Sequence, residues 1–176
     1  REEGVGIITL NRPDVLSALN RALFSELDVA VSELEEDSEV AALIFTGAGD
    51  RAFSAGADIH EMARLAELPD SPPPDPRRSD YVWHIATCTK PTIGAINGLA
   101  YGGGALMASS FDIRVGCERT TFKFLAASYG RVNSTWNLPM QVGWPVAKEL
   151  LFTGREVDAR ESHRIGLLNH LVSADQ

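Results

Sequence analysis

The stretch Asn97-Gly-Leu-Ala-Tyr-Gly-Gly-Gly-Ala-Leu-Met-Ala-Ser-Ser-Phe-Asp112 decides the fold. A run rich in β-branched residues, 91–96, leads into it, and Gly102, Gly103 and Gly104 lie at its centre, so a strand, a tight turn and the start of a buried helix are predicted. Glycine lets another molecule approach the backbone, and the first amides of a helix lack partners of their own. The stretch therefore predicts either a site for developing negative charge or a glycine-packed crossing of a helix and a strand.

Length and charge narrow the function classes. The 176 residues amount to one domain, and the hydrophobic content of 44% is typical of a globular protein. A net charge of -8, without a cluster of Lys and Arg, argues against nucleic-acid or membrane binding as the main task. Cys88 and Cys117 lack the spacing of a disulfide framework or a zinc site. Because the two cysteines indicate no disulfide framework, we expect a cytoplasmic protein in a reducing compartment. No apolar run approaches the roughly 18 residues of a membrane span.

Strands and helices alternate along the chain, which predicts an α/β architecture with β/α crossovers. Residues 5–10 and 41–46 are expected to be buried strands, separated by a helix that Asn20 caps and that runs to about Glu36. Residues 69–79 are rich in proline and are expected to form a loop or lid. The remaining expected elements are a short helix at 81–87, strands at 111–116 and 120–124, a small helix or loop at 125–132, a helix at 146–152 and a helix opened by Asp158 and closed by Gly166.

A second informative stretch is Phe53-Ser-Ala-Gly-Ala-Asp-Ile-His-Glu-Met62. Small residues around Gly56 permit close approach of the backbone. Asp58 is expected to cap a helix that carries Ile59, Met62 and Leu65 on one side, rather than to act as a catalyst. No second metal ligand stands four residues after His60, so no metal site is expected.

Four motifs in order resemble the crotonase (enoyl-CoA hydratase/isomerase) superfamily. They are Asn11-Arg-Pro-Asp-Val-Leu-Ser-Ala-Leu-Asn20, the stretch from Phe53 to Met62, Lys90-Pro-Thr-Ile-Gly-Ala-Ile-Asn-Gly-Leu-Ala-Tyr-Gly-Gly-Gly104, and Leu151-Phe-Thr-Gly-Arg through Gly166-Leu-Leu-Asn-His-Leu-Val172. The resemblance implies a single domain over 1–176, built as a spiral of ββα units. It also implies assembly as a homotrimer or hexamer, whereas the C-terminal helices that support the trimer in the family are absent from this chain.

The resemblance further implies an acyl-CoA substrate and no cofactor beyond the coenzyme A thioester itself. By motif position, the backbone N–H groups of Ala57 and Gly103 would hold the thioester oxygen. Such donors stabilise an enolate-like oxyanion more than the ground state. Contacts to substrate and coenzyme A are expected from Leu16, Ala18, Ala55, Asp58, Ile59 and Gly102.

Two departures from the family pattern bear on the reaction. Family hydratases carry glutamates at the positions that Leu106 and, by ungapped counting, Ala126 occupy here. Neither side chain can move a proton, and positioned acid–base catalysis contributes about 10²–10⁴ for each group. We therefore expect poor hydration and keep three alternatives: another acyl-CoA reaction such as decarboxylation, hydrolysis or isomerisation, a hydratase with slight activity, and a non-catalytic acyl-CoA-binding subunit.

Other superfamily branches place a functional side chain on the loop after Gly130. Ser134 lies nearest to that position and is the candidate for holding a substrate group or a water molecule. The alternative is that Ser134 or its neighbours Asn133 and Thr135 cap the next helix. The remaining candidates for a base are His60, His84 and Glu61.

Overall fold

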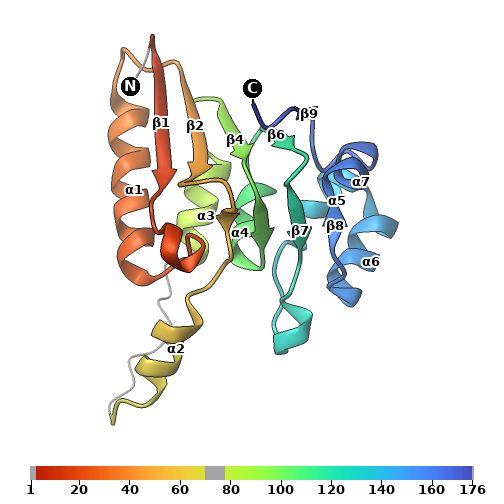
Figure 1. The fold of residues 1–176 in the computed structure, drawn as a ribbon. Helices are drawn as coiled ribbons and strands as arrows, with labels where there is room; N and C mark the ends of the chain where they lie inside the picture. Colours follow the sequence, from red (N-terminus) through yellow and green to blue (C-terminus); the bar gives the residue numbers. More distant parts are fainter. Residues whose placement is uncertain (1–2, 70–77, 176) are drawn as a thin grey trace.

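The computed structural model describes residues 3–69 and 78–175 and contains two β-sheets with helices around them (Figure 1). The strands are β1 (Val5–Leu10), β2 (Ala42–Gly47), β3 (Ala52–Ser54), β4 (Thr92–Ile96), β5 (Leu99–Tyr101), β6 (Ile113–Cys117), β7 (Thr121–Lys123), β8 (Val157–Asp158) and β9 (His170–Val172). The helices are α1 (Arg21–Glu36), α2 (Ile59–Ala66), α3 (Arg78–Ala86), α4 (Gly103–Ala108), α5 (Leu138–Val142), α6 (Trp144–Thr153) and α7 (Ala159–Arg164). Two short 3-10 helices, η1 (Pro13–Val15) and η2 (Ala127–Tyr129), complete the described elements.

The chain alternates between the two sheets. One sheet has the order β1-β2-β4-β6-β9 and its pairs are all parallel. The other has the order β3-β5-β7-β8, in which only β7 and β8 are antiparallel. Each of β2, β4 and β6 is followed by one strand of the second sheet and then by a helical segment. The expected spiral of ββα units is therefore confirmed.

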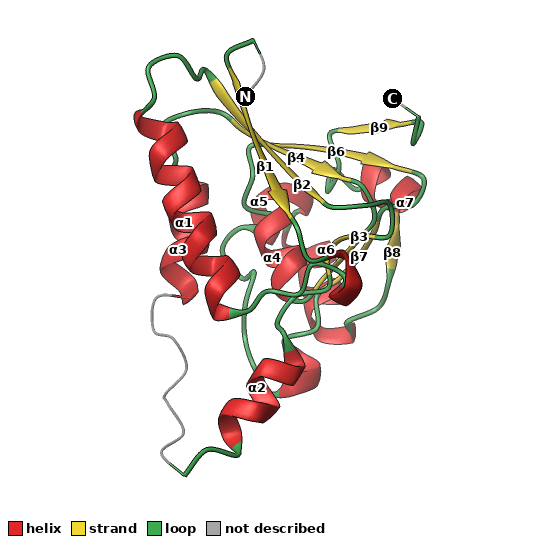
Figure 2. Cartoon of the chain, turned by 60° about the vertical axis from the view of Figure 1, so that its left-hand side comes forward, coloured by secondary structure: helices red, strands yellow, loops and turns green. Residues whose placement is uncertain are grey.

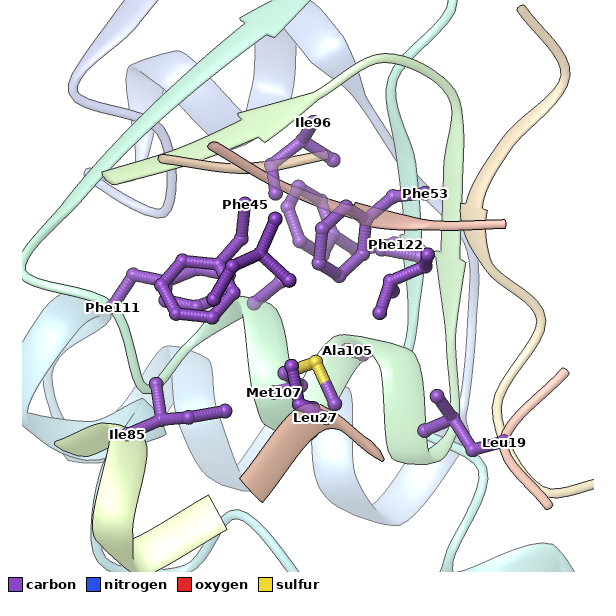
Figure 3. Packing of buried hydrophobic residues seen from close by; sticks show 14 of the residues in the cluster. Leu19, Leu27, Phe45, Phe53, Ile85, Ile96, Ala105, Met107, Phe111 and Phe122 are labelled. Carbon is purple, nitrogen blue, oxygen red and sulfur yellow. The ribbon is translucent and has the colours of Figure 1, made fainter. Parts of the chain in front are cut away.

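Aromatic side chains fill the space between the sheets and α4. The Phe45 and Phe111 rings stack with centroids 4.6 Å apart, and Phe53 meets Phe111 edge to face at 6.0 Å. Figure 3 shows these rings close to Met107 and Ala105 of α4, all of them fully buried. This packing fixes the helix that follows the three glycines against the strands.

The predicted α1 is confirmed, with Asn20 as its cap. The Asn20 side chain accepts a hydrogen bond from the Leu23 amide at 2.9 Å. α1 lies beside α3 (Figure 2), and the rings of Phe24 and Tyr81 stack between them at 5.4 Å. α3 begins at Arg78, earlier than the expected start at residue 81, so the end of the proline-rich segment is helical. Residues 70–77 of that segment lie outside the described residues.

Short strands that were not expected from the sequence include β3 and β5. β5 lies between β4 and the glycines, and β3 begins the second informative stretch. Each has three residues, too few to show a periodic pattern. Both belong to the second sheet, so the two glycine-containing loops both follow strands of that sheet.

Helix α2 has the expected cap, but none of its residues is buried. Asp58 accepts a hydrogen bond from the Glu61 amide at 3.0 Å. Ile59 is 63% exposed. α2 projects from the rest of the molecule in Figures 1 and 2, and the described residues cover its apolar side only in part.

The last helices agree with the sequence, except at one cap. α6 ends at Thr153, with Gly154 as its C-cap, and α7 begins after Asp158, which accepts from the Glu161 amide at 2.7 Å. α5 begins at Leu138, and its cap is Asn137. The expectation that Ser134 or Thr135 caps this helix is wrong, because the helix starts farther along the chain.

In the part of the chain that the structure describes, no helix combines the length and the apolar character needed to cross a membrane.

Candidate active site

The segment that ends at Leu19 pairs with the loop before α2. The Ala55 amide donates to the Leu16 carbonyl at 2.9 Å, and the Leu19 amide donates to the Gly56 carbonyl at 2.7 Å. The Asp58 amide then donates to the Leu19 carbonyl at 3.1 Å. These backbone hydrogen bonds hold the loop along its whole length.

The same hydrogen bonds set the direction of the Ala57 amide. Ala57 forms an isolated parallel bridge with Leu19, which bonds to Gly56 and Asp58 on either side of it. Because successive amides of an extended segment point to opposite sides, the Ala57 N–H points away from Leu19.

Glycines allow the turn before α4 to meet this loop. A Cβ atom on Gly56 would lie 2.5 Å from the Tyr101 carbonyl oxygen and 2.8 Å from the Gly103 nitrogen. Gly56 also has a φ of +87°, a region that L side chains rarely adopt. A Cβ atom on Gly103 would lie 3.7 Å from the Ala57 nitrogen. Two loops far apart in the sequence therefore come into contact at Ala57 and Gly103.

Both of these amides lack a partner. Within residues 3–69 and 78–175, neither the Ala57 nor the Gly103 N–H has a hydrogen-bond acceptor, and both residues are half-buried. Two backbone donors that meet in this way can bind one oxygen atom and stabilise negative charge on it.

An ion pair beside Ala57 was not predicted from the sequence. Arg12 Nη1 donates to Asp58 Oδ2 at 2.8 Å and to the Ala18 carbonyl at 2.6 Å. Burial raises the pKa of the Asp58 carboxyl, but the hydrogen bond from the Glu61 amide and the Arg12 guanidinium outweigh it and hold that pKa below its ordinary value. The only signal was that Arg12 and Asp58 each lie inside a family motif.

Leu106 and Ala126, the two positions where glutamates are expected in the family's hydratases, lie on different elements of the fold. Leu106 lies in α4 and is half-buried, with its carbonyl accepting from the Ser110 hydroxyl at 2.8 Å. Ala126 is half-buried at the start of η2. Neither side chain can donate or accept a proton.

Ser134 combines burial, strain and an unsatisfied hydroxyl. It is 1% exposed and has a φ of +54°. Its Oγ has no hydrogen-bond partner in the described part of the chain, and the same holds for the buried Oδ1 of Asn133. A buried polar atom without a partner and a non-glycine residue at positive φ both cost stability, and such features cluster at functional sites.

Polar contacts hold the Ser134 loop against α4. The Asn137 side chain donates to the hydroxyls of Ser109 and Ser110, each at 2.9 Å. The buried Arg114 of β6 donates to Gln141 of α5 at 2.6 Å. Ser134 therefore lies on a loop that is fixed to the helix that begins at Gly103.

The other candidate bases already have partners or lie in the open. His60 is exposed on α2, and the Glu61 carboxylate accepts from the Arg21 amide at 3.1 Å. His84 belongs to α3 and contacts α1, with Nδ1 2.8 Å from Asp28 Oδ1 and Nε2 3.1 Å from Glu35 Oε2. His84 therefore connects two helices and does not join Ala57 and Gly103.

Burial and two neighbouring carboxylates shift the pKa of His84 in opposite directions. Burial lowers the pKa of His84, but the carboxylates of Asp28 and Glu35 outweigh it and raise the pKa above its ordinary value. The Thr89 amide and hydroxyl, with a smaller contribution from His84, lower the pKa of Glu35 to about 2.

The residues expected to contact coenzyme A gather around the same loops. Leu16 has a φ of +53° and is half-buried, as is Ala55, whereas Ala18 is buried. A Cβ atom on Gly102 would meet nothing within 4 Å. Asp58 is 8% exposed, and both of its carboxylate oxygens already accept hydrogen bonds within the chain. No group of three or more metal-binding side chains occurs among the described residues.

Comparison with known proteins identifies the family of this chain. The whole chain, residues 1–176, matches the family model described as enoyl-CoA hydratase/isomerase. The chain belongs to the enoyl-CoA hydratase/isomerase family. The resemblance to the crotonase superfamily is thereby confirmed, and the pair of amides can be considered in terms of this family's chemistry.

Relatives in the family are named as hydratases and as an isomerase. The short-chain-enoyl-CoA hydratase of Clostridium acetobutylicum is 36% identical, over 100% of this chain and 68% of that protein. The structure of enoyl-CoA hydratase subunit I from Geobacillus kaustophilus matches with a TM-score of 0.85 and 36% identity, over 99% of this chain and 68% of that one. A monofunctional enoyl-CoA isomerase from M. smegmatis matches with a TM-score of 0.79 and 29% identity, over 98% of this chain and 74% of that one.

Proposed function

We propose that this family member is an acyl-CoA enzyme in which the amides of Ala57 and Gly103 hold the oxygen of the substrate's thioester. The meeting of these two loops carries the proposal, because each amide is unpaired within the described residues. A thioester carbonyl that gains enolate character presents the charge that such donors stabilise. Loss of one donor of this kind costs about 2.7–4 kcal/mol, or on the order of 10²–10³ in rate.

The coenzyme A part of the substrate is proposed to lie against the segment that pairs with the Ala57 loop. The proposed contacts, made mostly through backbone and apolar atoms, are Leu16, Ala18, Ala55, Asp58, Ile59 and Gly102. The thioester is the substrate, and no further cofactor is proposed. The family resemblance also supports a cytoplasmic protein that assembles as a homotrimer or hexamer. Sedimentation of the protein would test the oligomeric state.

The reaction proposed is enolate chemistry other than ordinary hydration. Leu106 and Ala126 stand where the family's hydratases are expected to carry glutamates, and neither can transfer a proton. The names of the relatives favour hydration, whereas these two positions favour decarboxylation, hydrolysis or isomerisation of an acyl-CoA. Crotonyl-CoA turnover is expected to be at least about a hundredfold below that of an ordinary hydratase.

Ser134 is proposed to hold a polar group of the substrate or a water molecule. Its buried hydroxyl has no partner in the described residues, and it does not cap α5. A serine hydroxyl without a neighbouring base is a weak nucleophile, so a positioning role is favoured over attack.

The second candidate function is a non-catalytic acyl-CoA-binding subunit. Such a subunit would bind the thioester through the two amides and would need no acid–base group. The apolar side chains of Leu106 and Ala126 are compatible with this function.

A mass-spectrometric screen distinguishes these functions. The protein is incubated with saturated, 2-enoyl, β-keto and malonyl-type CoA thioesters, and both binding and conversion are followed. We expect at least one of these thioester classes to be converted, by a reaction other than simple hydration. Binding of all classes with conversion of none would establish the second candidate, and ordinary crotonyl-CoA hydration would refute the interpretation of Leu106 and Ala126.

A further inference from the structure

Three contacts hold the residue that follows Ala57. The Asp58 amide donates to the Leu19 carbonyl at 3.1 Å, and Asp58 Oδ1 accepts from the Glu61 amide at 3.0 Å. Asp58 Oδ2 accepts from Arg12 Nη1 at 2.8 Å. The Asp58 side chain is 9% exposed, so the ion pair is largely shielded from water on that side.

Arg12 connects both segments that flank the bridge between Leu19 and Ala57. Its Nη1 donates to the carbonyl of Ala18, just before Leu19, and to the carboxylate of Asp58, just after Ala57. Its own carbonyl accepts from the Ser17 amide at 2.9 Å. One guanidinium nitrogen thus fixes the two sides of the bridge to each other.

Packing of α2 does not replace these contacts. α2 begins directly after Asp58, yet none of its residues is buried. The backbone at Ala57 is therefore positioned by hydrogen bonds and by the ion pair rather than by apolar contacts of the helix that follows.

Helix capping alone does not explain the arginine. Asp158 caps α7 with the same Asp-x-x-Glu pattern, and its Oδ1 accepts from the Glu161 amide at 2.7 Å. Asp158 is exposed and forms no ion pair within the described residues. A capping aspartate in this chain does not require a cationic partner.

We propose that Arg12 and Asp58 are positioning residues that set the direction of the Ala57 amide toward the thioester oxygen, a role that rests on the proposed function. The pair touches neither the proposed oxygen site nor Gly103. Its effect is exerted through the backbone between Gly56 and Asp58.

The test measures polarisation of a bound thioester carbonyl. Crotonyl-CoA labelled with ¹³C at the thioester carbonyl serves as the probe, and the carbonyl stretch is followed by difference infrared spectroscopy. Donors to the carbonyl oxygen lower this frequency on binding to the wild type. Asp58→Asn keeps the size of the side chain and an oxygen that can cap α2, but it removes the charge that faces Arg12. We expect Asp58→Asn to lose more than half of the frequency shift.

Matched variants separate positioning from a general loss of structure. Asp158→Asn removes the same charge from the other capping aspartate and should keep the full shift. Arg12→Gln should lose the shift, and Arg12→Lys should recover most of it, because an ammonium can donate to both acceptors. Where the wild type turns over a thioester, kcat should fall tenfold or more in Arg12→Gln with little change in KM, since a misplacement of about 1 Å costs on the order of 100-fold.

Two results would overturn the inference, and they are distinguishable. If the wild type shifts the carbonyl and both Asp58→Asn and Arg12→Gln, shown to be folded by circular dichroism, shift it equally, the pair has no positioning role. If the wild type binds the probe without any shift, the proposed oxyanion site itself is wrong, and the inference falls with it. Should Asp58→Asn fail to fold, the contrast between Arg12→Gln and Arg12→Lys decides the question.

Discussion

A methyl group at Gly103 would make one tight contact, which a small shift of the neighbouring side chain relieves. A Cβ atom there would lie 3.3 Å from Leu19 Cδ1, at the end of a flexible side chain, and 3.7 Å from the Ala57 nitrogen. Gly103→Ala is therefore expected to keep the free energy of unfolding within about 1 kcal/mol of the wild type. The added methyl group would border the proposed oxygen site, so kcat/KM for a converted thioester should fall about 100-fold. Steady-state kinetics and urea unfolding of the same preparation measure both quantities.

Gly56 provides the contrasting substitution. Gly56→Ala would force a side chain against the Tyr101 carbonyl oxygen at a positive φ, and it should destabilise the fold by more than about 1 kcal/mol. A folded Gly103→Ala variant with unchanged kcat/KM would contradict a role for this turn in catalysis.

Ser134 gives a prediction in which stability and activity change in opposite directions. Its hydroxyl is buried without a partner in the described residues, and leaving such a group unpaired costs about 1–3 kcal/mol. Ser134→Ala should therefore unfold at the same or a higher temperature than the wild type, while losing affinity or turnover for the acyl-CoA that it serves. Thermal unfolding with and without the thioester reports both effects. Lower stability with unchanged turnover would mean that the hydroxyl is purely structural.

Restoring acid–base groups tests the interpretation of the two apolar positions. The double variant Leu106→Glu and Ala126→Glu should raise crotonyl-CoA hydration by at least about tenfold, because each positioned carboxyl typically contributes about 10²–10⁴. The rate is followed by loss of enoyl absorbance. The matched control is the pair of substitutions to glutamine, which adds similar side chains that cannot transfer protons; equal rates in both double variants would exclude this explanation.

At the scale of elements, His84 makes the contact between α1 and α3 dependent on pH. Its pKa is raised above the ordinary value of 6.5, so protonated His84 stabilises the folded state below pH 6.5, and this contribution is lost as the pH rises through the folded pKa. The pKa of Glu35 falls from 4.5 to about 2, so its contribution is present above pH 4.5 and is lost as the pH falls toward 2.

The expected outcome is a pH-dependent free energy of unfolding. Stability of the wild type should decline as the pH rises above 6.5 and through the raised pKa of His84 in the folded state. His84→Gln should be less stable at the lower end of this range and should show a flatter profile. Urea unfolding at a series of pH values measures both, and parallel profiles for the two proteins would rule out His84 as the source of the slope.

Elements with strong end signals were predictable from the sequence. Asn20, Asp58 and Asp158 each cap the helix that follows them, because their side chains satisfy amides that have no partner within the helix. β3 and β5 were missed, since three residues carry no usable pattern. The cap of α5 was placed too early because Ser134 and Thr135 have the right chemistry, and only the fold selects Asn137.

The contacts of the candidate site were less predictable than its residues. Motif position identified Ala57 and Gly103, and their roles stay a prediction, but no local pattern reports which distant backbone a glycine touches. Arg12 follows β1 and Asp58 follows β3, and only the fold brings the two side chains together. The unsatisfied hydroxyl of Ser134 likewise becomes visible only when its surroundings are known.

At the scale of the whole molecule, both sheets contribute to positioning the two loops of the site. The glycine-containing loops follow β3 and β5, which are neighbours in the second sheet. The first sheet sets the spacing of the units that carry them. The meeting of Ala57 and Gly103 thus depends on both sheets.

The strand order also has a consequence for biosynthesis. β3 pairs with β5 and has no hydrogen-bonded strand on its other side in the described sheet. A ribosome adds about 5–20 residues per second, so several seconds separate the emergence of Ser54 from that of Leu99. Throughout this interval both edges of β3 lack a partner strand, and open strand edges invite pairing with other chains. Early chaperone binding to the growing polypeptide would therefore be most useful between these two points of translation.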